Sequence, residues 1–243
     1  MTPPPEQRRA AAFNSLALFD LDHTLIPFDS GMAWTGFLVE RGVLPAGADE
    51  HYLDCCRQYV AGTLDIRALH RALLQPLLQQ PRAALAPWQL EFQAAMAPRV
   101  PPAMLALVRR HQRAGHLCAI VTATPAPIAE PLARLFDLEA LLATVAATVG
   151  GGMDGTAGAQ FTGEIDGEPC HGHHKVERVD RWLASRPAGT KAGLASFARS
   201  WFYSDSISDL PLLGRVSDPV AVRPDARLRA HASRFGWCVL DAG

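Results

Sequence analysis

Short apolar runs recur along the chain, and the first three of them end in polar or acidic residues. They do not alternate strictly between apolar and polar positions, so both faces of each run would be buried. Such runs are typical of strands in a parallel sheet that is covered on both sides. We expect strands over residues 15–21, 117–122, 200–204, 219–222 and 237–240.

Helical patterns lie between these runs. Residues 102–114 repeat apolar positions at helical spacing and are followed by Gly115, a residue type that commonly ends helices. Residues 127–136 and 175–183 show similar patterns. Because strands and helices alternate in this way, the sequence predicts an α/β fold with a mainly parallel sheet.

One long segment, residues 30–98, interrupts this alternation because it contains no good strand. Its helical patterns are broken by Pro76, Pro81 and Pro87. We expect helices over residues 33–41, 50–61 and 66–80. The segment is therefore predicted to be a small all-α insert between the first and second strands of the core.

A second irregular stretch, residues 150–172, is rich in glycine and is expected to be a loop with a hairpin around residues 160–165. Residues 140–149 are ambiguous and are compatible with a further strand. We expect a disordered lead-in over residues 1–12, a core domain over 13–29 and 99–243, and a helical domain over 30–98.

Composition narrows the function classes. Of the 243 residues, 49% are hydrophobic and 19% are charged, which excludes a chain that is disordered throughout. The 23 Lys and Arg residues nearly balance the 24 Asp and Glu residues, so no basic field favours nucleic acid or an anionic membrane. No apolar run is long enough to predict a membrane span. The 5 cysteines include no C-x-x-C pair and no signal-peptide pattern is present, so we expect a cytoplasmic protein.

Two carboxylates, Asp20 and Asp22, lie at the end of the first predicted strand. Open α/β sheets bind ligands at the carboxyl ends of their strands. Buried carboxylates are costly unless they are paired or bound to a metal. Residues two apart in an extended chain point to the same side. A hard cation that contacts both acids would offset their repulsion.

The third strand is followed by two further acids, Asp205 and Asp209. Acids at two strand ends form a set of oxygen ligands that suits magnesium. Thr122 ends the second strand and supplies a hydroxyl group, and Lys175 supplies a positive charge. A metal held by acids on one side, with a hydroxyl and an ammonium on the other, is what a phosphoryl group requires.

Taken in order, Asp20-x-Asp22-x-Thr24, Thr122, Lys175 and Asp205-x3-Asp209 resemble the four motifs of the haloacid dehalogenase (HAD) superfamily. Within it, the chain is most similar to the phosphoserine-phosphatase-like subfamily, whose helical cap also follows the first motif. The resemblance spans residue 16 to about residue 240. It implies a Rossmann-like, three-layer core and a small all-α cap.

The resemblance also implies roles in catalysis. Asp20 would be the nucleophile that attacks phosphorus and forms an aspartyl-phosphate. Asp22 would protonate the leaving alkoxide and then activate water. Thr122 and Lys175 would bind the phosphate oxygens.

A metal site is implied as well. Asp205 would bind Mg²⁺ together with Asp20 and the backbone carbonyl of Asp22. Asp209 would be a further ligand or would orient the ligands. The cofactor predicted from the resemblance is therefore Mg²⁺.

Three positions depart from the family pattern. The family often has Gly or Ser where this chain has His23, and usually has Gly where it has Ser204. At the position that Asp29 occupies after Asp20, phosphoserine phosphatases have a Glu, which recognises the amino group of the substrate. Because Asp is one methylene shorter, we expect an amino-alcohol phosphate, with histidinol phosphate beside phosphoserine as a candidate.

Some residues allow two interpretations. His23 is either a substrate contact or a neighbour of the acidic charges, and Arg57 either reads a second substrate charge or is a surface residue of a helix. The stretch Cys170-His171-Gly172-His173-His174 either binds zinc or shapes the approach to Lys175. Zinc sites usually take ligands from two separate segments, which favours the second interpretation.

These features predict a Mg²⁺-dependent phosphomonoester hydrolase that acts on a small polar metabolite. One alternative is a phosphotransferase to another alcohol, and another is a non-catalytic phosphate-binding or phospho-acceptor module. We expect a small-molecule partner, no nucleic acid or membrane, and a monomer or homodimer.

Overall fold

A computed structural model gives the arrangement of the chain. The described residues are 13–78, 85–138, 140–150, 160–186 and 193–241. The expected lead-in over residues 1–12 lies outside them.

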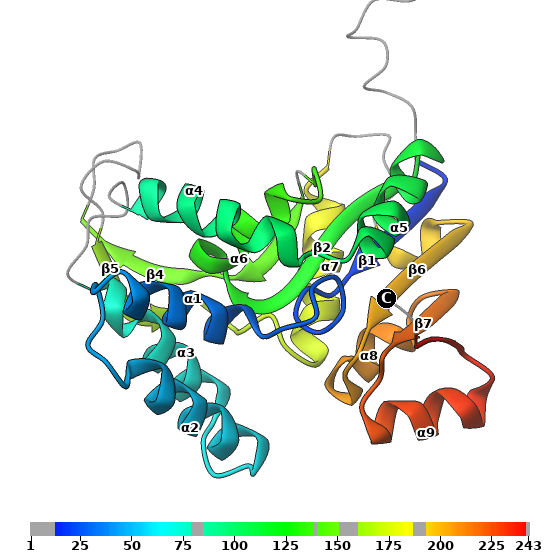
Figure 1. Ribbon diagram of the computed structural model, residues 1–243. Helices are drawn as coiled ribbons and strands as arrows, with labels where there is room; N and C mark the ends of the chain where they lie inside the picture. The colour runs from blue at the N-terminus through cyan, green and yellow to red at the C-terminus, as the bar shows by residue number, and fades with distance from the viewer. Residues whose placement is uncertain (1–12, 79–84, 139, 151–159, 187–192, 242–243) are drawn as a thin grey trace, which may run out of the picture.

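A parallel sheet of six strands has the order β3-β2-β1-β6-β7-β8. Its strands are β1 (Ser15–Phe19), β2 (Leu117–Pro125), β3 (Leu141–Thr144), β6 (Arg199–Ser204), β7 (Asp218–Val222) and β8 (Cys238–Leu240). Figure 1 shows its middle strands β2, β1, β6 and β7 side by side. The five strands expected from the apolar runs are present, so the predicted parallel α/β fold is confirmed. The ambiguous segment supplies the edge strand β3.

Helices cover both faces of this sheet. They are α5 (Pro102–Arg113), α6 (Ala126–Arg134), α7 (His173–Ala184), α8 (Leu210–Leu213) and α9 (Ala226–Phe235), with 3₁₀ turns at Leu194–Ser196 and Ile207–Asp209. Leu16 and Leu18 of β1 are buried in one cluster with α7, α8 and α9. Ala17 and Phe19 are buried in a second cluster with α5 and α6. Alternate side chains of a strand point to opposite faces, so β1 is buried on both sides in a three-layer, Rossmann-like fold.

The insert after β1 is helical. It contains α1 (Ser30–Glu40), α2 (Ala48–Val60), α3 (Ile66–Leu74) and α4 (Leu85–Met96), with 3₁₀ turns at Gln75–Leu77 and Ala97–Arg99. The helix expected over residues 66–80 is shorter, because α3 ends at Leu74. Helix α4 was not expected, since Pro87 was interpreted as a break. Pro87 lies in the first turn of α4, where its missing N–H has no helical partner.

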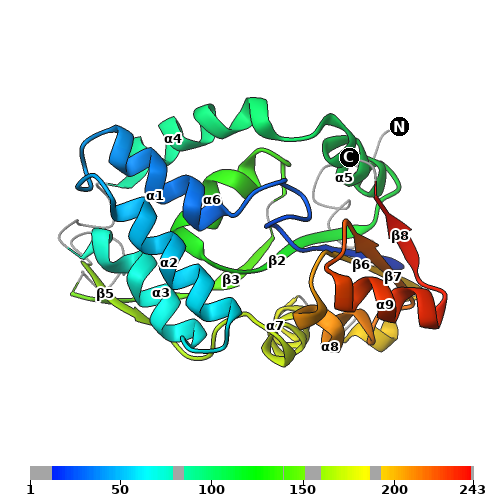
Figure 2. The same cartoon turned by 60° about the horizontal axis from the view of Figure 1, so that its bottom comes forward.

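The helices α1, α2 and α3 lie side by side, while α4 runs along α6 (Figure 2). The Gln89 amide of α4 donates a hydrogen bond of 2.6 Å to the Pro127 carbonyl. Trp34 and Phe92 of the insert are buried in the same apolar cluster as Phe19 of the sheet. The insert and the sheet therefore share one continuous core.

A small antiparallel sheet joins β4 (Ala146–Val149) to β5 (Gln160–Ile165). The hairpin expected around residues 160–165 is thus one strand that pairs with a partner earlier in the chain. Helix α3 packs against β5, and the Arg71 guanidinium binds both carboxylate oxygens of Glu164, at 2.6 and 3.0 Å. This sheet consequently extends the contact between the insert and the rest of the protein.

The strand order places β1 between β2 and β6, where the chain changes the direction in which it adds strands. Open α/β sheets bind ligands at the carboxyl ends of the strands beside such a point. Asp20 and Asp205 directly follow β1 and β6, whereas Thr122, expected to end the second strand, lies within β2, which continues to Pro125. Over the described part of the chain, no helix is both long enough and apolar enough to cross a membrane.

Candidate active site

A cavity of about 330 Å³ opens at the carboxyl ends of β1, β2 and β6, between the main sheet and helices α2 and α3. Its lining includes eight of the nine residues singled out from the sequence. They are Asp20, Asp22, His23, Asp29, Thr122, Lys175, Asp205 and Asp209. A larger hollow of about 780 Å³ lies along β6, β7 and β8, but Asp218 is the single acid in its lining.

Lys175 occupies the centre of the charged groups. Its Nζ lies 2.8 Å from Asp20 Oδ1 and 2.7 Å from Asp209 Oδ2. The Ser204 hydroxyl donates a further hydrogen bond of 2.7 Å to Asp209 Oδ2. All four side chains are buried, so helix α7 delivers a positive charge to the ends of two strands.

The charges of this group shift one another's proton affinity. Burial raises the pKa of Asp20 well above its usual value; Lys175 lowers it, and the charges of Asp209 and Asp205 raise it. Burial alone would lower the pKa of Lys175, but Asp20 and Asp209 outweigh it, so the pKa is raised and the ammonium stays protonated. Burial raises the pKa of Asp205 to about 6. Asp20 and Asp209 therefore share one ammonium group, and Asp205 adds a third carboxylate charge close to them.

This excess of negative charge fits a hard divalent cation. Asp20, Asp205 and Asp209 supply oxygen atoms, the ligands that Mg²⁺ prefers. Asp209 Oδ1 is buried and has no hydrogen-bond partner, so one oxygen remains available for a further contact. The acids do not form a closed cage around a point, because the Lys175 ammonium lies between Asp20 and Asp209.

Asp22 is held apart from the lysine. Its two carboxylate oxygens accept hydrogen bonds of 2.6 Å, one from the backbone N–H of Ser30 and one from the hydroxyl of Thr124. The Ser30 and Thr124 hydroxyls lie 3.0 Å apart, and the Thr122 hydroxyl accepts from the Thr124 N–H. The start of α1 and the end of β2 therefore fix Asp22. Sequence reasoning missed Ser30 and Thr124, because nothing near them in the sequence marks the contact.

The loop after Asp22 is fixed by contacts from distant segments. The Thr24 hydroxyl donates to Asp205 at 3.2 Å. Arg223 donates to the backbone carbonyls of His23 and Thr24, at 2.9 and 2.8 Å. His23 has a φ of 56°, in the left-handed region that glycine favours. Histidine is among the residue types that tolerate this conformation.

Asp29 lies at the wall of the cavity and also begins α1. Its carboxylate accepts a hydrogen bond of 2.7 Å from the Met32 N–H, so it caps the helix. Burial raises the pKa of Asp29 to about 6, and the charge of Asp22 adds to this effect. The structure does not bring Arg57 to the site, since its exposed guanidinium pairs with Asp54 and does not line the cavity.

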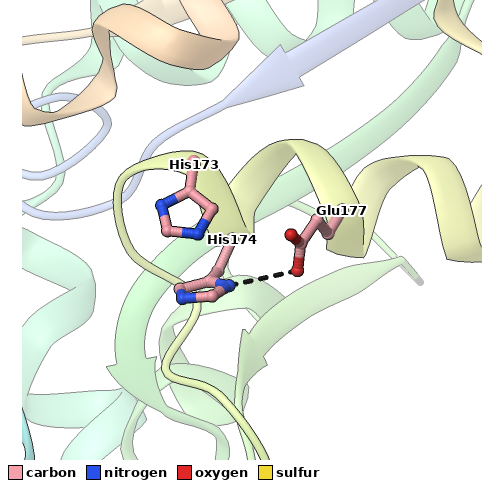
Figure 3. A group of neighbouring side chains, drawn as sticks. All are labelled: His173, His174 and Glu177. Atoms are coloured by element: carbon pink, nitrogen blue, oxygen red, sulfur yellow. Dashed lines mark hydrogen bonds and ion pairs between the residues drawn. The ribbon is translucent and has the colours of Figure 1, made fainter.

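The residues of the Cys170–His174 stretch point to different partners. The buried Cys170 thiol donates to the Leu142 carbonyl, and His171 bonds to the Tyr59 hydroxyl of α2 at 3.0 Å. His173 and His174 lie at the start of α7 beside Glu177, and His174 bonds to Glu177 at 3.1 Å (Figure 3). The stretch is thus divided among three environments, and its last two histidines form part of an exposed polar cluster.

Helices α2 and α3 supply most of the remaining wall of the cavity. The residues that sequence reasoning did not single out there are Tyr52, Cys56, Tyr59, Val60, Ile66, Leu69, His70 and Leu73. Those of α3 recur at i, i+3, i+4 and i+7, a stripe that the sequence does contain. Such a stripe on its own indicates only a buried helix face.

Comparisons with known proteins agree with this geometry. The family model described as haloacid dehalogenase-like hydrolase matches residues 17–214. A histidinol-phosphatase of Neisseria meningitidis is 38% identical over 229 residues, covering 93% of this chain and 98% of that protein. A phosphoserine phosphatase of Mycobacterium tuberculosis is 32% identical, covering 98% of this chain and 72% of that protein.

Solved structures show the same architecture. A Bordetella pertussis protein of unknown function superposes with a TM-score of 0.83 at 38% identity, covering 95% of this chain and 99% of that chain. A substrate-bound phosphoserine phosphatase superposes with a TM-score of 0.61, covering 93% of this chain and 92% of that chain. Its identity is 16%, so this second likeness concerns the fold alone.

Proposed function

Since the chain belongs to the haloacid dehalogenase-like hydrolases, we propose that it is a Mg²⁺-dependent phosphatase of a small amino-alcohol phosphomonoester. The observation that carries this proposal is the position of two acids in one cavity. Asp20 is bound to the Lys175 ammonium, while Asp22 is held separately by Ser30 and Thr124. One acid is thus suited to nucleophilic attack and the other to proton transfer.

The proposed reaction has two steps. An oxygen of Asp20 bonds to phosphorus while the bond to the leaving alkoxide breaks, and Asp22 gives that alkoxide its proton. Asp22 then accepts a proton from a water molecule that attacks the aspartyl-phosphate, and inorganic phosphate and free Asp20 result. Lys175 and Thr122, which line the same cavity, would bind the phosphate oxygens during both steps.

Asp20, Asp205 and the backbone carbonyl of Asp22 would hold Mg²⁺, with Asp209 as a further ligand or as a group that orients them. When bound, the ion neutralises negative charge on the phosphoryl group and on the acids. The raised pKa of Asp20 supports its presence, because a nucleophilic carboxylate must be ionised. Ser204 and Lys175 keep Asp209 in place through its Oδ2 atom.

The substrate proposal rests on the size and charge of the cavity. Its volume of about 330 Å³ is near the lower end for ligand sites, which suits a small metabolite. Asp29, which lines the same cavity, would attract an amino group of the substrate. Similarity to the Neisseria histidinol-phosphatase over nearly the whole of both chains supports histidinol phosphate as the first candidate, with phosphoserine as the second.

We further propose that residues 30–98 form a cap domain over this cavity. Tyr52, Tyr59 and His70 of the insert line the cavity, which supports this role. Closure of such a cap would exclude water during phosphoryl transfer. The 5 cysteines are free, which supports a reducing, cytoplasmic location.

Phosphate release from a panel of metabolites tests the proposal. Purified protein with Mg²⁺ is incubated with histidinol phosphate, phosphoserine, phosphocholine, glycerol phosphate and sugar phosphates. We expect release that requires Asp20, so that Asp20→Asn is inactive, and that a chelator abolishes. Substrate loss without phosphate release, when an alcohol acceptor is added, would instead identify a phosphotransferase. No reaction of any substrate by folded, Mg²⁺-binding protein would contradict the proposal.

A further inference from the structure

His70 is the single polar residue in the stripe of α3 that faces the cavity. The other members are Ile66, Leu69 and Leu73, and all four residues line the cavity. A polar ring in an apolar wall is costly unless its nitrogen atoms have partners. The chemistry of this ring is therefore informative about what the cavity binds.

One side of the ring has a partner and the other has none. The His70 ring is hydrogen-bonded to the backbone of Ala123, the residue between Thr122 and Thr124. Its Nδ1 atom is buried and has no hydrogen-bond partner. The insert thus reaches strand β2 through His70, a residue that lines the cavity and whose Nδ1 atom is left without a partner.

The charge state of the ring determines what this nitrogen can bind. Burial lowers the pKa of His70 to about 4, so the imidazole is neutral near pH 7. A neutral imidazole has one N–H donor and one acceptor nitrogen. The bond to Ala123 raises the pKa, which is the effect of an N–H that donates to a carbonyl. The remaining nitrogen, Nδ1, is then an acceptor and requires a donor.

We propose that His70 is a specificity-determining residue, whose Nδ1 accepts a hydrogen bond from the alcohol portion of the substrate. The preferred phosphomonoesters would carry an N–H or O–H donor beyond the ester carbon, and alkyl phosphates without one would be poor substrates. This inference rests on the proposed phosphatase function and adds a second recognition point to Asp29. His70 lines the cavity and no protein group partners its Nδ1, so a substrate donor that reaches the ring would be its first partner.

Two substitutions separate recognition from structure. His70→Leu continues the apolar stripe of α3 and removes the acceptor, whereas His70→Asn retains an acceptor near the position of Nδ1. Neither variant alters Asp20, Asp22 or Lys175. His70→Leu removes the unpartnered nitrogen but also the N–H that donates to the Ala123 carbonyl, so we expect a modest fall in melting temperature, and the activity on a substrate without donors serves as the control for this structural effect.

The test compares histidinol phosphate, which carries donors, with propyl phosphate, which carries none on its alkyl chain. We expect His70→Leu to lower kcat/KM for histidinol phosphate about tenfold, mainly through KM, and to leave propyl phosphate unchanged. His70→Asn should recover most of the loss. Equal losses on both substrates, or no loss on either, would overturn the role of His70.

Binding of histidinol, the alcohol product, gives a readout that does not require turnover. Calorimetry should show that His70→Leu binds histidinol about tenfold more weakly than the original protein. His70-dependent binding without any hydrolysis would refute the phosphatase proposal and keep the recognition role. Hydrolysis together with binding that does not depend on His70 would refute the recognition role and keep the phosphatase.

Discussion

The Nζ atom of Lys175 lies 2.8 Å from Oδ1 of Asp20, although the two residues are 155 positions apart in the chain. The same ammonium contacts Asp209 at 2.7 Å. Removal of one member of a buried charge network leaves the others without compensation, which costs more than the pair itself contributes. Lys175 therefore links the stability of the fold to the charge of the candidate active site.

Replacement of Lys175 by methionine, which has similar length and no charge, tests this link. We expect Lys175→Met to lower the free energy of unfolding by about 3–5 kcal/mol, because Asp20 and Asp209 lose their shared counterion. We expect phosphatase activity to fall by at least about 100-fold. Urea unfolding and phosphate release measure the two effects. Arg181→Met, an exposed change on the same helix, is the matched control and should alter neither. Normal activity of Lys175→Met would contradict the proposed role.

Addition of Mg²⁺ should stabilise the protein, because a cation offsets the repulsion among Asp20, Asp205 and Asp209. At a Mg²⁺ concentration of about 100 times the Kd, binding linkage predicts that the free energy of unfolding rises by about 2.7 kcal/mol. Calorimetric melting with Mg²⁺ and with a chelator measures it. Asp205→Asn should lose most of the gain, whereas Asp54→Asn, which changes an exposed acid of α2, should retain it. If Mg²⁺ stabilised Asp205→Asn as much as the original protein, the ion would have to bind elsewhere.

The sequence is sufficient to predict the acids because their position follows from the strands. Each apolar run ends at a known residue, and parallel strands end at one edge, so Asp20 and Asp205 had to lie near each other. Thr122 and Lys175 are candidates from their residue type and their place beside the strands, and the resemblance to the family adds their roles. The same reasoning could not find Thr124 or His70, whose contacts depend on how distant segments pack.

Errors in the fold prediction have a similar origin. Pro87 was interpreted as a break, but the position of a proline within a helix decides its effect, and the first turn tolerates it. Residues 160–165 pair with β4, a contact across a connection of ten residues, 150–159, that the local pattern does not specify. Arg57 could not be assigned from sequence, because helical spacing does not distinguish a residue that faces the cavity from one that pairs with Asp54 on the surface.

Replacement of Thr124 by valine should weaken proton transfer. Valine keeps the shape of threonine but cannot donate to Asp22, whose second oxygen accepts at 2.6 Å from Thr124. We expect kcat to fall about tenfold, the effect of one lost hydrogen bond, with KM nearly unchanged. Steady-state kinetics measure both values. The matched control is Thr162→Val in β5, which removes a hydroxyl that donates to the Ala147 carbonyl away from the cavity. A rise in KM with constant kcat would instead place Thr124 in substrate binding.

We expect the buried His111 to make the folded protein less stable in mild acid. Its ring is buried between α5 and the sheet, with Nε2 2.8 Å from the Tyr203 hydroxyl and Nδ1 2.8 Å from His116. Burial lowers the pKa of His111 to about 4, and the neighbouring His116 and Arg110 act in the same direction. The unfolded chain, with an ordinary histidine pKa near 6.5, therefore takes up a proton before the folded protein does.

The contribution of the neutral His111 to the free energy of unfolding is therefore fully present above about pH 6.5. It is lost as the pH falls toward about 4. At pH 5, this single group should lower the free energy of unfolding by about 2 kcal/mol relative to pH 7. His111→Gln keeps hydrogen-bonding capacity and cannot take up a proton. The free energy of unfolding of this variant should therefore fall less between pH 7 and pH 5, by about the same 2 kcal/mol. Urea unfolding at the two pH values measures the difference, with His51→Gln on the exposed face of α2 as the control. Equal acid sensitivity of His111→Gln and the original protein would show that His111 is not the responsible group.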